Sequence, residues 1–195
     1  MIIFQEGQYY HFFNRGNNKE KLFREEENYI YFLDLIKKYL TPVVDIYAYC
    51  LLSNHFHFVF RIKDKCDLPI DIQSGHKKLH QPFSNLFNAY TKAFNKKYGR
   101  SGSLFQKHPV KHHIDTEEYL KNVIIYVNLN PDHHNLGNSF QYKYSSYKAL
   151  ISESHTLIKR GIVIDLFEDI PNFKYVHNYK KLKMDILNDI ILEDD

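Results

Sequence analysis

The stretch 55–61 alternates phenylalanine with other residue types, and it constrains the fold more than any other part of the chain. Because successive side chains of a β-strand point to opposite faces of a sheet, this alternation predicts a half-buried strand. Its three phenylalanines then share one face, and the imidazoles of His55 and His57 lie side by side on the other. Two histidines on one face of a rigid strand are suited to holding a metal ion.

The segments around this strand predict a mixed α and β architecture. Aromatic or β-branched runs bounded by turns indicate strands, and apolar residues at helical spacing indicate helices. The expected strands are 8–14, 43–51, 55–61 and 104–114, and the expected helices are 25–40, 81–98 and 115–129. This order is typical of a ferredoxin-like (RRM-like) α+β sandwich, in which helices pack on one face of an antiparallel sheet and the other face is open to a ligand.

Two local signals set the ends of these elements. Asp115, with Glu118 three residues later, is typical of a capping box, so Asp115 is the expected N-cap of the helix 115–129. Pro109 has no backbone N–H, so the strand 104–114 is expected at an edge of the sheet or broken at that residue.

The chain of 195 residues has the length of one domain with an extension. We expect the domain to span 1–150 and the extension 151–195, with a C-terminal helix at about 175–192. No apolar run approaches the roughly 20 residues that span a bilayer, and the N-terminal residues lack a signal-peptide pattern. A cytoplasmic location without membrane association is therefore expected.

Positive charge is concentrated in the middle of the chain. Residues 74–114 contain eight Lys or Arg and no Asp or Glu. A basic block interleaved with aromatic residues predicts contact with a nucleic-acid backbone, although a run of charge is also typical of a solvated helix face. The candidate DNA contacts are Arg15, Lys77, Lys78, Lys96, Lys97, Arg100, Lys107 and Lys111.

The helix 115–129 and the residue after it carry a possible nucleophile. Tyr126 and Asn130 are four residues apart and so lie on the same helix face. A phenol has a pKa of about 10 and is a poor nucleophile at neutral pH. It therefore needs an electrophile that is activated elsewhere, and a divalent ion held by His55 and His57 could polarise a phosphodiester for attack.

Five short motifs follow one another over residues 9–150. They are Phe13-Asn14-Arg15-Gly16-Asn17, Asn54-His55-Phe56-His57, Gly102-Ser103-Leu104-Phe105-Gln106, Tyr126-Val127-Asn128-Leu129-Asn130-Pro131 and Tyr144-Ser145-Ser146-Tyr147. In this order and spacing they resemble the one-tyrosine HUH transposases, and most of all the REP-associated tyrosine transposases. Each motif is weak alone, but their order and spacing are specific.

This resemblance implies a single-stranded DNA endonuclease and strand transferase that forms a covalent 5′-phosphotyrosine on hairpin DNA and uses Mg²⁺ or Mn²⁺. His55 and His57 fall on the metal ligands of the family, and Asn130 falls on the third ligand. Tyr126 falls on the nucleophile. Relatives act as homodimers or as monomers, and the C-terminal helix favours a monomer.

The chain departs from the family pattern in two places. Ser53 stands where a proline is common, and the segment 132–137 differs from the usual apolar continuation. The adjacent pairs His112-His113 and His133-His134 are interpreted as phosphate-facing or structural, because neighbours on a strand point to opposite faces.

Two other functions remain open. A ferredoxin-like sheet can bind single-stranded RNA or DNA by stacking without catalysis, with Tyr9, Tyr10 and Tyr47 as the candidate aromatics. A metal-dependent hydrolase that uses water in place of Tyr126 would cleave DNA and leave no covalent adduct.

Overall fold

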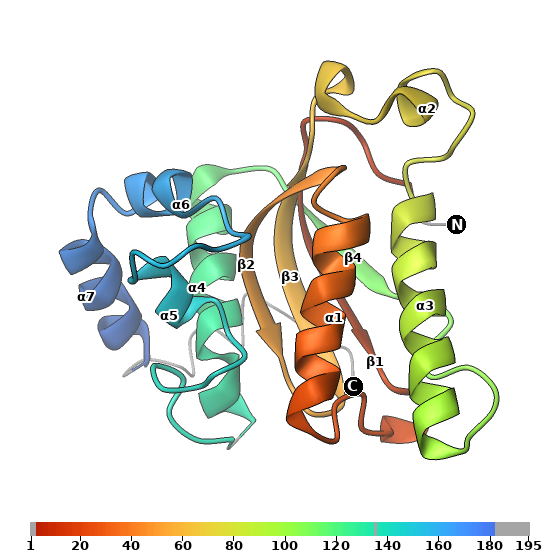
Figure 1. Ribbon diagram of the computed structural model, residues 1–195. Helices are drawn as coiled ribbons and strands as arrows, with labels where there is room; N and C mark the ends of the chain where they lie inside the picture. The colour runs from red at the N-terminus through yellow and green to blue at the C-terminus, as the bar shows by residue number, and fades with distance from the viewer. Residues whose placement is uncertain (1–2, 135, 182–195) are drawn as a thin grey trace.

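The computed structural model describes residues 3–134 and 136–181, and a four-stranded antiparallel sheet lies at its centre (Figure 1). The strands are β1 (Tyr9–Arg15), β2 (Val44–Leu51), β3 (His55–Ile62) and β4 (Val110–Ile114). The α-helices are α1 (Glu26–Tyr39), α2 (Ile70–Gln73), α3 (Gln81–Tyr98), α4 (Glu117–His133), α5 (Tyr147–Leu150), α6 (Arg160–Leu166) and α7 (Ile170–Lys181), with short 3-10 helices at Asn17–Lys19 and Lys65–Asp67. The strand order β2-β3-β1-β4 confirms the predicted ferredoxin-like α+β class.

β3 is an inner strand, paired on both edges. Phe13 of β1 lies opposite His57, and Arg15 lies opposite His55. On the other edge, Cys50 of β2 lies opposite His57. The backbone that carries the two histidines is therefore held by neighbouring strands on both sides.

The helices α1 and α3 cover the phenylalanine face of the sheet (Figure 1). Phe56 of β3 packs against Phe32 of α1, with ring centroids 5.3 Å apart. Phe60 packs against Phe83 of α3 at 5.4 Å. The alternation in the sequence thus produces an aromatic core behind the strand that carries the histidines.

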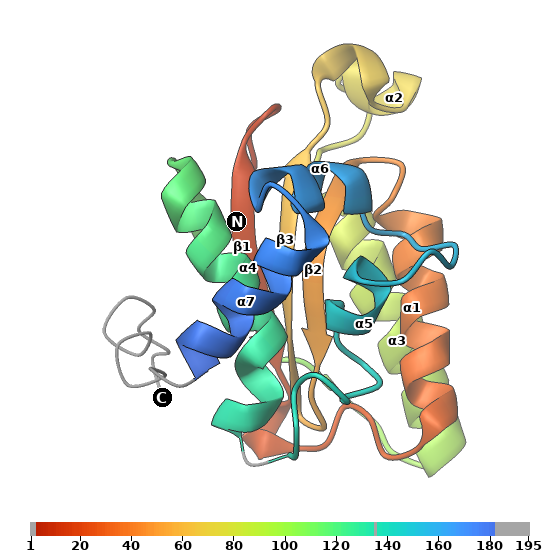
Figure 2. The same ribbon diagram turned by 90° about the vertical axis from the view of Figure 1, so that its left-hand side faces the viewer.

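The helix α4 lies on the opposite face, so the sheet stands between α4 and the pair α1 and α3 (Figure 2). The predicted class has helices on one face and can leave the other face open to a ligand, whereas here α4 covers part of that second face. The reason is that α4 presents apolar side chains such as Val123 and Val127, which are buried with Ala48 of β2 and Val59 of β3. That part of the second face is apolar and has to be covered.

The helix α4 is capped one residue later than the capping-box pattern predicts. The side chain of Thr116, rather than that of Asp115, accepts a hydrogen bond of 3.1 Å from the backbone N–H of Tyr119. Thr116 has the extended backbone of an N-cap residue, which aims its hydroxyl at this N–H.

The strand β4 is shorter than expected, and it is an edge strand that starts directly after Pro109. The preceding residues instead follow the end of β1 as a loop, in which the backbone N–H of Gln106 donates to the carbonyl of Arg15 at 2.9 Å. The expected strand 104–114 is thus interrupted at Pro109, and only the part after Pro109 pairs as a strand.

The segments after residue 150 pack onto α4. Val163 of α6 and Phe173 of α7 belong to the same hydrophobic cluster as Val123 of α4. The division into a domain 1–150 and an extension 151–195 stays a prediction. The helix α7 begins at Ile170, earlier than expected, and 182–192 of the predicted helix lie outside the described residues. Among the described helices none has the length and apolar character needed to cross a membrane.

A buried chain of hydrogen bonds fastens α7 to the sheet. His177 Nδ1 donates to the carbonyl of Phe173 at 2.7 Å, and Asn128 Nδ2 of α4 lies 3.2 Å from His177 Nε2. The hydroxyl of Ser146 donates to Asn128 Oδ1 at 2.6 Å and accepts from the backbone N–H of Tyr49 of β2 at 3.0 Å. In this network His177 is neutral, because its two ring nitrogens act as one donor and one acceptor.

The stability of the protein is expected to depend on the protonation of His177. Burial lowers the pKa of His177 to about 4, whereas an unfolded histidine has a pKa of about 6.5. Between these two pKa values the unfolded chain binds more protons than the folded chain. The free energy of unfolding is therefore not reduced by His177 above about pH 6.5, and it decreases as the pH falls from there to about 4. The contribution is about 3 kcal/mol, and urea unfolding of wild type and His177→Gln between pH 4 and 7 measures it. Equal pH dependence of the two proteins would contradict this prediction.

Candidate active site

His55 and His57 lie side by side on β3, as the alternation predicts. Their side chains are buried, at 5% and 0% exposure, and face α4 rather than the phenylalanine core. The two ring centroids are 5.2 Å apart and the ring planes are almost perpendicular.

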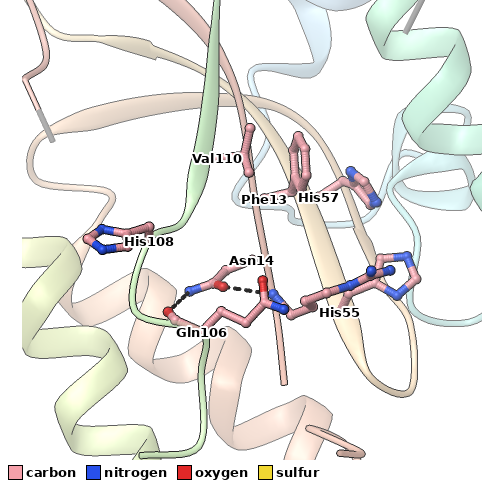
Figure 3. Close-up of a pocket in the computed structure, with 8 residues that line it drawn as sticks. Phe13, Asn14, His55, His57, Gln106, His108 and Val110 are labelled. Atoms are coloured by element: carbon pink, nitrogen blue, oxygen red, sulfur yellow. Dashed lines mark hydrogen bonds between the residues drawn. The ribbon is translucent and has the colours of Figure 1, made fainter. Parts of the chain in front are cut away.

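A pocket opens beside the two histidines (Figure 3). It is lined by Phe13, Asn14, Arg15, His55, His57, Gln106, His108 and Val110. The loop before β4 forms one wall, where the side-chain amide of Asn14 donates to the carbonyl of Gln106 at 3.2 Å. The guanidinium of Arg15 adds positive charge to the lining, so the pocket is suited to an anionic group.

His11 of β1 orients His57, and the sequence analysis did not single it out. His11 Nε2 lies 3.1 Å from His57 Nδ1, and the two rings are stacked with centroids 5.2 Å apart. A hydrogen bond at Nδ1 sets the ring orientation and tautomer of a histidine that binds a ligand through Nε2. The odd positions of β1 share the histidine face, but their order along β1 does not reveal which one meets His57.

The ring of His55 is held at both nitrogens. His55 Nδ1 donates to Asn54 Oδ1 at 2.7 Å, because an amide oxygen can only accept. His55 Nε2 lies 3.2 Å from His134 Nε2 at the end of α4. The pair His133-His134 therefore sits at a helix end and not on a strand, and both residues face the site, since the ring of His133 lies 5.5 Å from that of Tyr126.

Tyr126 packs directly over the histidine pair. Its ring stands edge-on to His57, with centroids 5.8 Å apart and an interplanar angle of 90°. It also stands edge-on to His11, at 6.0 Å. Tyr126 is 3% exposed. The helix α4 thus buries this phenol against two histidines that are far from it in the sequence.

Asn130 follows Tyr126 by one helical turn, and its side chain is fully buried. Within residues 3–134 and 136–181, neither its amide oxygen nor its amide nitrogen has a hydrogen-bond partner. A buried amide left in this way costs about 1–3 kcal/mol and calls for an explanation such as a bound ion. Two imidazole nitrogens and one amide oxygen form a donor set that fits a divalent cation.

The imidazoles of His55 and His57 and the amide of Asn130 do not form a complete metal-binding site by themselves. The described part of the chain contains no group of three or more His, Cys, Asp or Glu side chains arranged to hold a metal ion. The fit therefore rests on the histidine pair together with the amide of Asn130, which stays a predicted ligand.

Among the candidate DNA contacts, some line the pockets near the histidines and others are paired with groups of the protein itself. Arg15 lines the histidine pocket, and Lys107 lines an adjoining wider pocket that shares Asn14 and Gln106 with it. Of the remaining residues, three form ion pairs and one donates to a backbone carbonyl: Lys77 with Asp71, Lys97 with Glu25, Arg100 with Glu20, and Lys111 with Ile3. The exposed residues Lys78 and Lys96 lie outside the linings of both pockets.

The aromatic residues expected to stack on bases in a non-catalytic module are mostly buried. Tyr10 and Tyr47 are both in the core, and the ring of Tyr9 stands edge-on to that of Tyr47, at 5.2 Å. These side chains do not form an open stacking platform.

Comparison with known proteins gives a match of fold. No protein-family model and no curated protein matches the sequence. Among solved structures, the chain is similar to a REP-associated tyrosine transposase bound to a REP hairpin, with a TM-score of 0.57 and 15% sequence identity over 84% of this chain and 91% of that one. The α+β fold predicted from the order of strands and helices is therefore shared with that solved structure.

Proposed function

We propose that this chain is a metal-dependent, transposase-like HUH nuclease that cleaves and rejoins single-stranded, hairpin-forming DNA. The observation that carries the proposal is the packing of Tyr126 against His57, with the buried amide of Asn130 one turn further along α4. The shared fold with a hairpin-bound tyrosine transposase supports the same function. The non-catalytic module has less support, because two of its three candidate aromatics are buried.

The residues of the site have distinct roles in this reaction. His55, His57 and Asn130 are the residues that would hold Mg²⁺ or Mn²⁺, which when bound neutralises charge that develops on the scissile phosphate. Tyr126 Oη attacks phosphorus and loses its proton as the new O–P bond forms. The bond from phosphorus to the 3′ oxygen breaks, and that oxygen takes up a proton to become a 3′-hydroxyl. The product is a 5′-phosphotyrosine, which a 3′-hydroxyl can attack in the reverse sense to rejoin the strand.

The surroundings of the site fit this substrate. Arg15 and Lys107 line the two connected pockets, where they can pair with phosphates of the bound strand. The other basic residues of the block remain predicted DNA contacts. Tyr126 packs against His57 of its own chain, so the site can act in cis. This favours a monomer over a homodimer in which the tyrosine helix of each chain serves the metal site of its partner. The cytoplasmic location also stays a prediction.

The proposal predicts a covalent adduct of defined polarity. The protein is incubated with Mn²⁺ and a single-stranded hairpin oligonucleotide that carries a label on either its 3′ or its 5′ end. On a denaturing gel, the 3′-labelled strand should appear attached to the protein, and the 5′-labelled strand should appear as a shorter free product. EDTA should remove both products. Cleavage without an adduct would indicate a hydrolase that uses water, and binding without cleavage would indicate a non-catalytic module.

A further inference from the structure

We propose that His134 is a third imidazole ligand of this metal site and that the site consequently prefers a transition-metal ion to Mg²⁺. The inference rests on the proposed function only in placing a metal ion at His55. It goes beyond that function, because it adds a protein ligand and chooses among the possible ions.

His134 lies at the end of α4, on the face that points to the site. It is the C-cap residue and follows Asn130 by four residues, as Asn130 follows Tyr126. The rings of His134 and His55 are 4.5 Å apart between centroids, and their planes are inclined at 69°. One helix thus presents a phenol, an amide and an imidazole in successive turns.

The two nitrogens that face each other are the ones that would share an ion. His55 Nδ1 carries a proton, because it donates to Asn54 Oδ1. The lone pair of His55 is therefore on Nε2, which lies 3.2 Å from His134 Nε2. Imidazole nitrogens that bind one Zn²⁺-like ion at about 2.0–2.1 Å with tetrahedral angles are separated by roughly 3.3 Å. The observed spacing, which is that of a hydrogen bond between the two rings, also fits a shared ion.

The two other proposed ligands, His57 and Asn130, do not converge with His55 and His134 as the side chains stand. The ring of His57 is 5.2 Å from that of His55, and the amide of Asn130 is buried without a partner among the described residues. Rotation of these side chains about their χ angles would close a set of three imidazoles and one amide oxygen. As the side chains stand, the described residues contain no group of three or more His, Cys, Asp or Glu arranged to hold a metal ion, these three histidines included, so the proposed set forms only when the ion binds.

The additional nitrogen changes which ion the site favours. Mg²⁺ is a hard ion that prefers oxygen ligands and keeps several waters, whereas imidazole suits zinc and other transition metals. Replacing a water by the imidazole of His134 therefore strengthens binding of Co²⁺ or Zn²⁺ and does little for Mg²⁺.

Metal binding without DNA tests this inference. Calorimetry with Co²⁺ and with Mg²⁺ is compared for wild type, His134→Ala and His134→Gln, together with the visible absorption of bound Co²⁺. Both variants should bind Co²⁺ at least about 10-fold more weakly than wild type, because the loss of a residue that only supports a ligand already costs about that much, and the absorption spectrum should change. His155→Ala is the matched control, because His155 is exposed, and it should bind Co²⁺ as wild type does. Thermal unfolding without metal shows that each variant is folded.

The outcomes separate this inference from the proposed function. Co²⁺ binding that is unchanged or tighter in both His134 variants, or wild-type Mg²⁺ binding as tight as that of Co²⁺, would overturn the inference. Failure of wild type to bind Co²⁺ at all would overturn it as well. If Co²⁺ affinity depends on His134 but no DNA adduct forms, the inference stands and the proposed nuclease function fails.

Discussion

The variant Tyr126→Phe is expected to lose the covalent protein–DNA adduct, with a decrease in strand cleavage on the order of 10³-fold or more. The substitution removes only the hydroxyl oxygen that attacks phosphorus. The phenyl ring can keep its edge-on contacts with His57 and His11, so the site should keep its shape. The adduct assay with 3′-labelled hairpin DNA measures the loss, and Co²⁺ calorimetry should show that metal binding is retained.

Tyr119→Phe is the matched control on the same helix. Tyr119 lies in the first turn of α4, where its backbone N–H takes part in capping, and its ring is only partly buried. The control should form the adduct at the wild-type rate. If Tyr126→Phe forms the adduct as well as wild type, another group is the nucleophile and the assignment of Tyr126 is wrong.

The variant Phe32→Ala is expected to lower the free energy of unfolding by about 3–5 kcal/mol. Phe32 of α1 is 0% exposed, and its ring contacts Phe23, Phe56 and Tyr90 with centroids 4.9–5.3 Å apart. Truncation removes these contacts and leaves a cavity that rigid aromatic neighbours cannot fill. Because Phe56 is the residue between His55 and His57, the cavity lies directly behind the strand of the site. Guanidinium unfolding of both proteins measures the difference.

Ile30→Ala is the control for this prediction. Ile30 is in the same helix and is 50% exposed, so its truncation should change the free energy of unfolding by no more than about 0.5 kcal/mol. Equal losses in the two variants would show that the core around β3 does not have the packing described above.

Much of the site could be predicted because it depends on local periodicity. The strand alternation at 55–61 places His55 and His57 on one face, and the structure confirms this geometry. Helical spacing places Tyr126 and Asn130 on one face of a helix, and the structure contains that helix. Their roles as ligands and nucleophile remain predictions for the experiments above.

The details that the sequence missed depend on segments that are far apart. His11 and His57 are 46 positions apart, and His55 and His134 are 79 positions apart. No periodicity connects such residues. The ion pairs of Lys97 with Glu25 and of Arg100 with Glu20 also join distant segments. The two acids precede α1, whereas the two bases lie at the end of α3 or directly after it. The basic block looked uniform in the sequence because those acids are not part of it.

The amino-acid sequence by itself determined the strand of the site, the order of elements and the helix that carries Tyr126, because backbone geometry repeats every two residues in a strand and every 3.6 in a helix. Only the tertiary structure decided that α4 packs on the histidine face, since which apolar surface a helix covers depends on what the rest of the fold leaves exposed. That packing places Tyr126 over His57 and His134 against His55. Because α4 packs on the sheet face that carries His55 and His57, the two histidines and Tyr126 together form a candidate catalytic centre.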